Sequence, residues 1–226
     1  MFKKTFSMIC CVIFLQGCSQ EQEVKKEMIN METALLAATE KNETNTVISL
    51  LKQGANINAT DSQGRTPLMI ATYKNDVKTA KALIKAGADV NIQDDMKNNP
   101  FLYAGAEGYL DILKLTIDAG ADPTITNRYG GTALIPASEH GYIDVITELL
   151  TRTNIDVNHV NNLGWTALME AIVLSNGNET QQQVIRLLIE HGADVNITDN
   201  DGVPPLEHAR AHHFKEIEKI LLEGRK

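Results

Sequence analysis

The chain has 226 residues, of which 43% are hydrophobic and 22% are charged, and its formal net charge is −8. This balance is typical of a globular protein with enough apolar chain to bury a sizeable core. Only 5% of the residues are aromatic, so the core must consist mostly of aliphatic side chains. Nucleic acids select basic surfaces, and the acidic balance therefore argues against a nucleic-acid partner.

The first seventeen residues have the pattern of a targeting segment. Lys3 and Lys4 make a basic start, and the apolar stretch 8–15 that follows is too short for a comfortable permanent membrane span. The stretch ends in "LQGC", residues 15–18, which resembles the lipobox of bacterial lipoprotein signals. The resemblance implies cleavage before Cys18 and attachment of lipid to that cysteine. An ordinary signal peptide or a buried apolar helix is the alternative.

The lipobox resemblance also implies a domain organisation and a location. Residues 1–17 would be removed, residues 18–30 would form the lipidated cysteine and a polar tether, and residues 31–226 would form the folded domain, although the end of the tether could equally begin a helix. The other two cysteines lie in the removed segment, so no free thiol would remain. Ser19, in place of the Asp that resembles an inner-membrane retention signal, favours the outer membrane of a Gram-negative cell, facing the periplasm. Removing Lys3 and Lys4 changes the net charge from −8 to −10, so the lipid would have to do the anchoring.

The rest of the chain is built from a repeated phrase that opens with Thr, Asn or Pro and has an alanine five residues later. It reads "TALLAAT" at 33–39, "TPLMIAT" at 66–72, "NPFLYAG" at 99–105, "TALIPAS" at 132–138, "TALMEAI" at 166–172 and "PPLEHAR" at 204–210. Glycine-led phrases close four units: "GANIN" at 54–58, "GADVN" at 87–91, "GADPT" at 120–124 and "GADVN" at 192–196. The fourth unit departs from this pattern with "TNIDVN" at 153–158.

These phrases resemble the ankyrin repeat. The resemblance implies an all-α repeat solenoid of about six units, each a helix-turn-helix followed by a β-hairpin or loop, elongated and curved. In each unit the side chains have matching roles: we expect Thr66 and Thr132 to cap first helices, and Gly87 to end a second helix with a positive φ. A β-branched residue at Gly87 should cost at least ~1 kcal/mol, because φ > 0 is strained outside glycine.

The fifth unit contains an insertion. Ala171 and Gly192 are 21 residues apart, whereas Ala71 and Gly87 are 16 apart. The extra residues fall within "SNGNETQQQ", 175–183, whose composition predicts a solvated, protruding turn. On this interpretation, deletion of residues 176–180 should leave the fold intact.

The sequence contains no pattern that indicates catalysis. His208 and His212 are four residues apart, which suits one helix face, but no third metal ligand accompanies them. No phosphate-binding glycine loop or nucleophile elbow is present. We therefore expect a protein without enzymatic activity, metal or cofactor.

The resemblance implies that a partner protein binds at the hairpin tips and at the exposed edges of the first helices. Side chains at these positions do not repeat from unit to unit, and the candidates are Arg65, Tyr73, Lys74, Asp95, Asn98, Glu107, Arg128, Tyr129, Glu139, His140, Leu163 and Trp165. Tyr129, Leu163 and Trp165 supply the largest apolar groups, and aromatic residues dominate interface hot spots. The alternative for Trp165 is local packing over its own hairpin.

These observations favour a monomeric, membrane-tethered, non-catalytic protein-binding module of the bacterial cell envelope. Two more specific roles come from resemblance to ankyrin-like proteins in bacteria. One is an immunity lipoprotein that binds and neutralises a secreted antibacterial effector such as a lipase. The other is an envelope stress-protection factor associated with a catalase.

Overall fold

The computed structural model describes residues 25–224, which form a stack of helix pairs. The first helix covers residues 25–40. The later helices are α2 (Thr44–Lys52), α3 (Pro67–Tyr73), α4 (Val77–Lys85), α5 (Pro100–Ala106), α6 (Leu110–Asp118), α7 (Leu134–His140), α8 (Ile143–Arg152), α9 (Ala167–Val173), α10 (Glu179–Glu190), α11 (Pro205–Ala211) and α12 (Lys215–Glu223).

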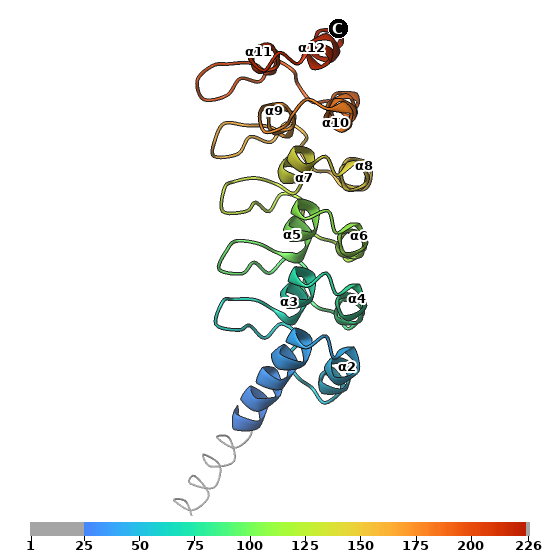
Figure 1. Ribbon diagram of the computed structural model, residues 1–226. Coiled ribbons are helices and arrows are strands. Elements are labelled where there is room, and N and C mark those ends of the chain that lie inside the picture. The colour runs from blue at the N-terminus through green and yellow to red at the C-terminus, as the bar shows by residue number, and fades with distance from the viewer. Residues whose placement is uncertain (1–24, 225–226) are drawn as a thin grey trace, which may run out of the picture.

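Figure 1 shows that the helices form two columns. The short inner helices α3, α5, α7, α9 and α11 follow one another in one column, and the outer helices α2, α4, α6, α8, α10 and α12 form the other. Between consecutive repeats the chain makes a loop, here called a finger, that projects beyond the inner column. The prediction of six helix pairs is confirmed. The fingers are turns, since no residue between 25 and 224 is in a β-strand.

The core runs along the whole stack between the two columns. The alanines that recur in the inner helices are buried, and Ala71, Ala104 and Ala137 are 0% exposed. Their small side chains let neighbouring inner helices approach closely. One repeat cannot cover its own apolar face, so each repeat is stabilised by its neighbours.

The helix ends agree with the sequence at most positions, but not at Thr132. Thr66 caps α3 as predicted, since its side chain accepts a hydrogen bond from Met69 N at 3.1 Å. The predicted cap by Thr132 is wrong, because α7 starts later and the buried Thr132 Oγ1 has no partner. Ile135 N donates instead to the Thr132 carbonyl oxygen at 3.3 Å.

Glycines end several outer helices in the predicted left-handed conformation. The φ angles are 93° at Gly87, 82° at Gly120 and 94° at Gly192. A Cβ at any of these positions would meet no heavy atom within 4 Å, so the penalty for substitution is backbone strain alone.

The predicted tether overlaps the first helix. Residues 25–30 are helical and continue into the first inner helix, and Met28 and Ile29 are exposed on it. Cys18 and the predicted targeting segment lie outside the described residues. Within residues 25–224, no helix has the length and apolar character needed to cross a membrane.

The predicted turn in the fifth repeat is solvated at Asn176 and at residues 178–180, but part of the insertion is helical and packs on the neighbouring repeats. Asn178 caps α10 by accepting from Gln181 N, and α10 has 12 residues where α4 and α6 have nine. The Gln181 side chain is buried and donates to the Glu139 carbonyl oxygen at 2.7 Å. Gly177 packs so closely on Phe214 that a Cβ would lie 2.5 Å from its ring. The inserted residues thus extend the helix and contact both neighbouring repeats.

Candidate protein-binding face

One turn design builds all five fingers. In each, the side-chain oxygen of the first residue accepts hydrogen bonds from the backbone N–H groups two and four residues later, at 2.8–3.0 Å. The first residues are Asp61, Asp94, Asn127, Asn161 and Asp199. Because one Asp or Asn organises the turn, the other side chains are free to vary. The fingers and the inner-helix edges beside them are called the finger face below.

At the N-terminal end of the finger face, predicted candidates are engaged in ion pairs within the chain. Arg65 donates to Asp61 Oδ2 at 2.7 Å and to Glu40 Oε1 at 2.9 Å. Lys74 Nζ lies 3.7 Å from the other oxygen of Glu40. The hydrogen bond from Arg65, acting against the effect of burial, lowers the pKa of Asp61. These charges are fixed in place before any partner arrives.

Tyr73 joins the second and third repeats. Its hydroxyl donates to Asp94 Oδ2 at 2.5 Å and accepts from Asn98 Nδ2 at 3.2 Å. Its ring meets Tyr103 edge-on, with the centroids 4.4 Å apart. Burial and the hydrogen bond to Asp94 raise the pKa of Tyr73 to about 12. The structure thus brings two predicted residues, Tyr73 and Asn98, into one network.

A hollow of about 300 Å³ lies between the first two fingers. It is lined by Gln63, Arg65, Tyr73, Asp94, Asp95 and Met96. The exposed Asp95 carboxylate stands at this hollow, and its backbone N–H donates to the Gln63 carbonyl oxygen at 3.1 Å. This bond connects the first two finger tips.

The third and fourth fingers present large side chains to solvent. Tyr129 and Leu163 are each 55% exposed. Arg128 stacks over the Tyr129 ring at 4.7 Å and donates to its hydroxyl at 2.6 Å. Trp165 is half-buried, and Asn162 N donates to the Tyr129 carbonyl oxygen at 3.0 Å, which holds these two fingers together. The three large apolar groups singled out from the sequence therefore lie on two connected fingers.

The remaining candidates lie at the inner-helix edge. Glu107 and His140 are exposed, and Glu139 is half-buried. The His140 ring lies 5.4 Å from that of Tyr142. Burial, followed by the nearby Glu107 carboxylate, raises the pKa of Tyr103.

Sequence reasoning missed a buried carboxyl group, Glu170, in α9. It is 7% exposed, and Oε1 accepts from Asn161 Nδ2 at 2.8 Å. Burial, with the charge of Glu139 second, raises the pKa of Glu170 to about 7. The sequence did contain a signal for this burial. Glu170 directly precedes the repeated alanine Ala171, and the second and third repeats carry Ile70 and Tyr103 at the same position.

His208 and His212, which the sequence places on one helix face, have separate contacts. His208 Nε2 lies 2.7 Å from Asp199 Oδ2, and the His212 ring stacks on Phe214 with centroids 5.2 Å apart. In the part of the chain that the structure describes, no three His, Cys, Asp or Glu side chains are grouped so as to hold a metal ion.

Comparison with known proteins agrees with this architecture. A family model described as ankyrin repeats in three copies matches residues 4–94 and 101–199. Over 77 residues the chain is 49% identical to the ankyrin repeat protein YahD of Escherichia coli K12. A Rickettsia felis ankyrin repeat protein is 33% identical over 79 residues. These matches span 38% and 20% of the lengths of those two proteins.

Solved structures match over most of the described chain. A crystal structure of an ankyrin repeat domain from Acinetobacter baumannii AYE is 49% identical, with a TM-score of 0.82, and the match covers 84% of this chain and 96% of that one. The ankyrin repeat protein EF0377 is 42% identical at the same TM-score, with coverage of 85% and 98%. Ankyrin repeats imply a protein-binding module.

Proposed function

Since the chain belongs to the ankyrin-repeat family, we propose that it is a non-catalytic module that binds a protein partner on the finger face and is tethered to an envelope membrane through lipid on Cys18. The observation that carries the binding site is the exposure of Tyr129 and Leu163, each 55% exposed, on adjacent connected fingers. Aromatic and apolar side chains of this kind supply the core of protein interfaces. The half-buried Trp165 completes this patch.

The binding site is tested by photo-cross-linking in cells. A photo-reactive amino acid replaces Leu163 in one variant and Leu222 of α12 in a matched control, since Leu222 is also an exposed leucine, at 43%. We expect a discrete cross-linked protein from position 163 and none from position 222. A partner that cross-links equally at both positions, or only at 222, would remove the finger face as the docking surface.

The tether is supported by the basic start, the apolar run and the "LQGC" sequence at residues 15–18. Its test is the substitution Cys18→Ser in the full chain, followed by labelling with palmitate and membrane fractionation. We expect the variant to lose the label and to remain uncut or become soluble, whereas Cys11→Ser keeps both label and membrane association. Incorporation of label into Cys18→Ser would refute the assignment.

A further inference from the structure

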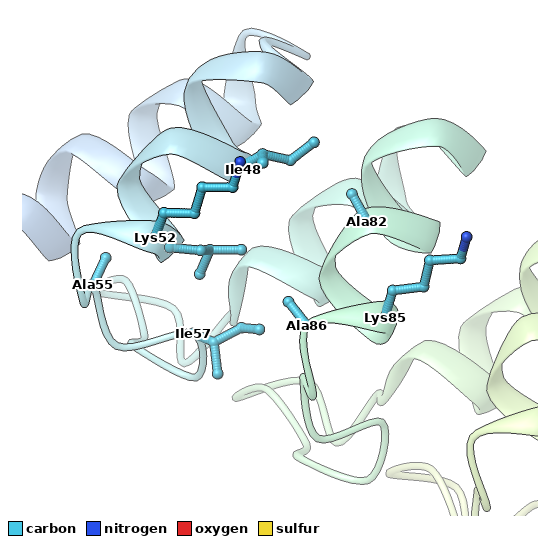
Figure 2. Close-up of a pocket in the computed structure, with 8 residues that line it drawn as sticks. Ile48, Lys52, Ala55, Ile57, Ala82, Lys85 and Ala86 are labelled. Carbon is cyan, nitrogen blue, oxygen red and sulfur yellow. The ribbon is translucent and has the colours of Figure 1, made fainter.

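A second apolar surface lies on the outer column of helices, away from the finger tips. A groove of about 540 Å³ separates the outer helices α2 and α4. Its apolar lining comes from both helices and from the loop after α2, namely Ile48, Leu51, Ala55, Ile57, Ala82 and Ala86. Figure 2 shows Lys52 on the α2 side and Lys85 on the α4 side of this lining. The groove therefore has an apolar floor and cationic rims.

The corresponding space between α6 and α8 is bridged by ion pairs. Lys114 Nζ lies 3.4 Å from Glu148, and Arg152 lies 2.6 Å from Asp118. Both pairs join one outer helix to the next. They are exposed or partly exposed, so they contribute little to the stability of the fold.

Between α2 and α4 the same positions cannot form these bridges. At the repeat spacing of 33 residues, two steps back from Lys114 and Glu148 lead to Ile48 and Ala82. The same two steps from Asp118 and Arg152 lead to Lys52 and Ala86. An apolar pair and a lysine–alanine pair have thus replaced two ion pairs.

Between α4 and α6 a larger residue takes the place of the alanine. Leu115 occupies in α6 the position that Ala82 occupies in α4, and its side chain is half-buried. Ala82 has a smaller side chain than Leu115, and the groove between α2 and α4 lies open above it. The first groove thus differs in sequence from the next two spaces of the outer column, which carry Lys81 and Lys114 in place of Ile48, and Leu115 and Glu148 in place of Ala82.

We propose that the groove between α2 and α4 is a second docking site, which receives an amphipathic helix with an apolar stripe and acidic flanks from a partner protein. Charge complementarity selects the acidic flanks: Lys52 and Lys85 border the floor, and α4 adds the exposed Lys78 and Lys81 in a chain whose net charge is −8. Asp89 follows the end of α4, where its carboxylate accepts from Asn91 N at 2.8 Å.

The shape of the groove suits a helix. Both walls are helices of nine residues, which at 1.5 Å per residue are about 13 Å long. That length accommodates two to three turns of a third helix, laid in by the helix-in-groove mode with apolar anchors at i, i+3, i+4 and i+7. The aliphatic stems of the rim lysines can extend the apolar contact while their ammonium groups reach the acidic flanks.

The probe is a displayed library of random linear peptides, long enough for several helical turns, selected on the protein. The main variant is Ala82→Leu, which fills the groove with the residue that α6 carries at this position and so preserves the fold. The second variant combines Lys52→Glu with Lys85→Glu. Lys219→Glu, an exposed lysine on α12, is the matched charge-reversal control, and thermal melting confirms folding of each variant.

We expect the selected peptides to carry helically spaced apolar residues with acidic flanks. Their affinity should fall about tenfold or more with Ala82→Leu and with the double reversal, and should be unchanged by Lys219→Glu. Peptides in which lysines replace the acidic residues should bind the Lys52→Glu, Lys85→Glu variant more tightly than the wild type. We expect Ala82→Leu to leave the cross-link from position 163 unchanged. A failure of the groove proposal can therefore be distinguished from a failure of the finger-face proposal.

Three results would overturn the proposal. The first is a selection that yields no peptide sensitive to Ala82→Leu. The second is binding to phosphatidylglycerol vesicles that Ala82→Leu abolishes, which would make the occupant a lipid surface. The third is a dimer in sedimentation that the same substitution dissociates, which would make it a second copy of this chain.

Discussion

The N-terminal part of the finger face and its middle part differ in how their polar groups are satisfied. Around the second and third repeats, Arg65 and Tyr73 are bound to Asp61, Glu40, Asp94 and Asn98 within the chain. Around the fourth and fifth repeats the fingers expose a tyrosine and a leucine, and the helix edge buries a carboxyl group of raised pKa. The polar groups of the N-terminal part are already paired within the chain, whereas the middle part exposes large apolar side chains.

This difference teaches which candidates are free for a partner. A side chain already held in an ion pair or buried hydrogen bond must break that bond before it gives a new one, so its net contribution to binding is small. An exposed aromatic ring breaks no such bond, so burying it contributes its full transfer free energy to binding. Tyr129, Leu163 and Trp165 are therefore expected to matter more than Arg65 and Tyr73.

These two parts of the finger face meet at a break in a ladder of asparagine side chains. Asn58 Oδ1 accepts from Asp89 N at 3.1 Å and Asn91 Oδ1 accepts from Asp122 N at 2.8 Å, each from one repeat to the next. Asn158 forms the same bond to Asp194 at 2.8 Å. At the corresponding place the third repeat has Thr124, whose hydroxyl donates to its own Asp122.

The largest effect is expected from deleting residues 176–180 in the C-terminal region. The deletion removes the Asn178 cap of α10 and the contact of Gly177 with Phe214. We expect the free energy of unfolding to fall by about 3 kcal/mol, measured by urea denaturation. Glu179→Ala, at an exposed position of the same segment, should change it by less than about 0.5 kcal/mol. An unchanged midpoint on deletion would mean that the segment does not couple the repeats.

Next in size is Trp165→Ala, set against Tyr73→Ala. We expect the first to weaken binding of the partner captured at position 163 by ~2 kcal/mol with little change in melting temperature. Tyr73→Ala should lower the melting temperature and leave binding nearly unchanged, because it removes the contacts of Tyr73 with Tyr103 and Asp94. Calorimetric titration and thermal unfolding of both variants measure the contrast. A lowered melting temperature with intact binding for Trp165→Ala would place the indole in the fold.

Glu170→Gln should reveal the pH dependence of the C-terminal region. Because the pKa of Glu170 is raised to about 7 from 4.5, the neutral form suits the folded state, and wild-type stability declines as pH rises from about 4.5 through 7. The variant should match the wild type below pH ~4 and exceed it by about 1–2 kcal/mol near pH ~8. Denaturation at both pH values tests this, with the exposed Glu107→Gln as control. A difference independent of pH would exclude titration of Glu170 as its cause.

The smallest effect concerns the break in the ladder. Thr124→Asn should restore a bond to the fourth repeat and raise the free energy of unfolding by about 0.5–1 kcal/mol. Asn91→Thr should lower it by a similar amount, since it removes the rung to Asp122. Equilibrium denaturation of the two variants decides the matter. Destabilisation by Thr124→Asn would show that the loop of the fourth repeat cannot receive the side chain.

Much of the fold was readable from the sequence because each repeat uses local chemistry. A threonine cap, a small inner alanine and a glycine with positive φ depend on residues only a few positions apart. The recurrence of these residues about every 33 positions predicted their register and the number of helix pairs. It also placed the variable side chains at the finger tips.

The remaining features depend on contacts between repeats, and only the tertiary structure decided them. Whether Thr132 finds a donor, whether Glu170 is charged and whether the segment 175–183 packs all depend on groups supplied by other turns or other repeats. The same is true of the open groove, since Ile48 and Ala82 are ordinary residues until α2 and α4 lie side by side. A repeat sequence determines its own turns, but the burial and pairing of a side chain depend on the neighbour that the stack places against it.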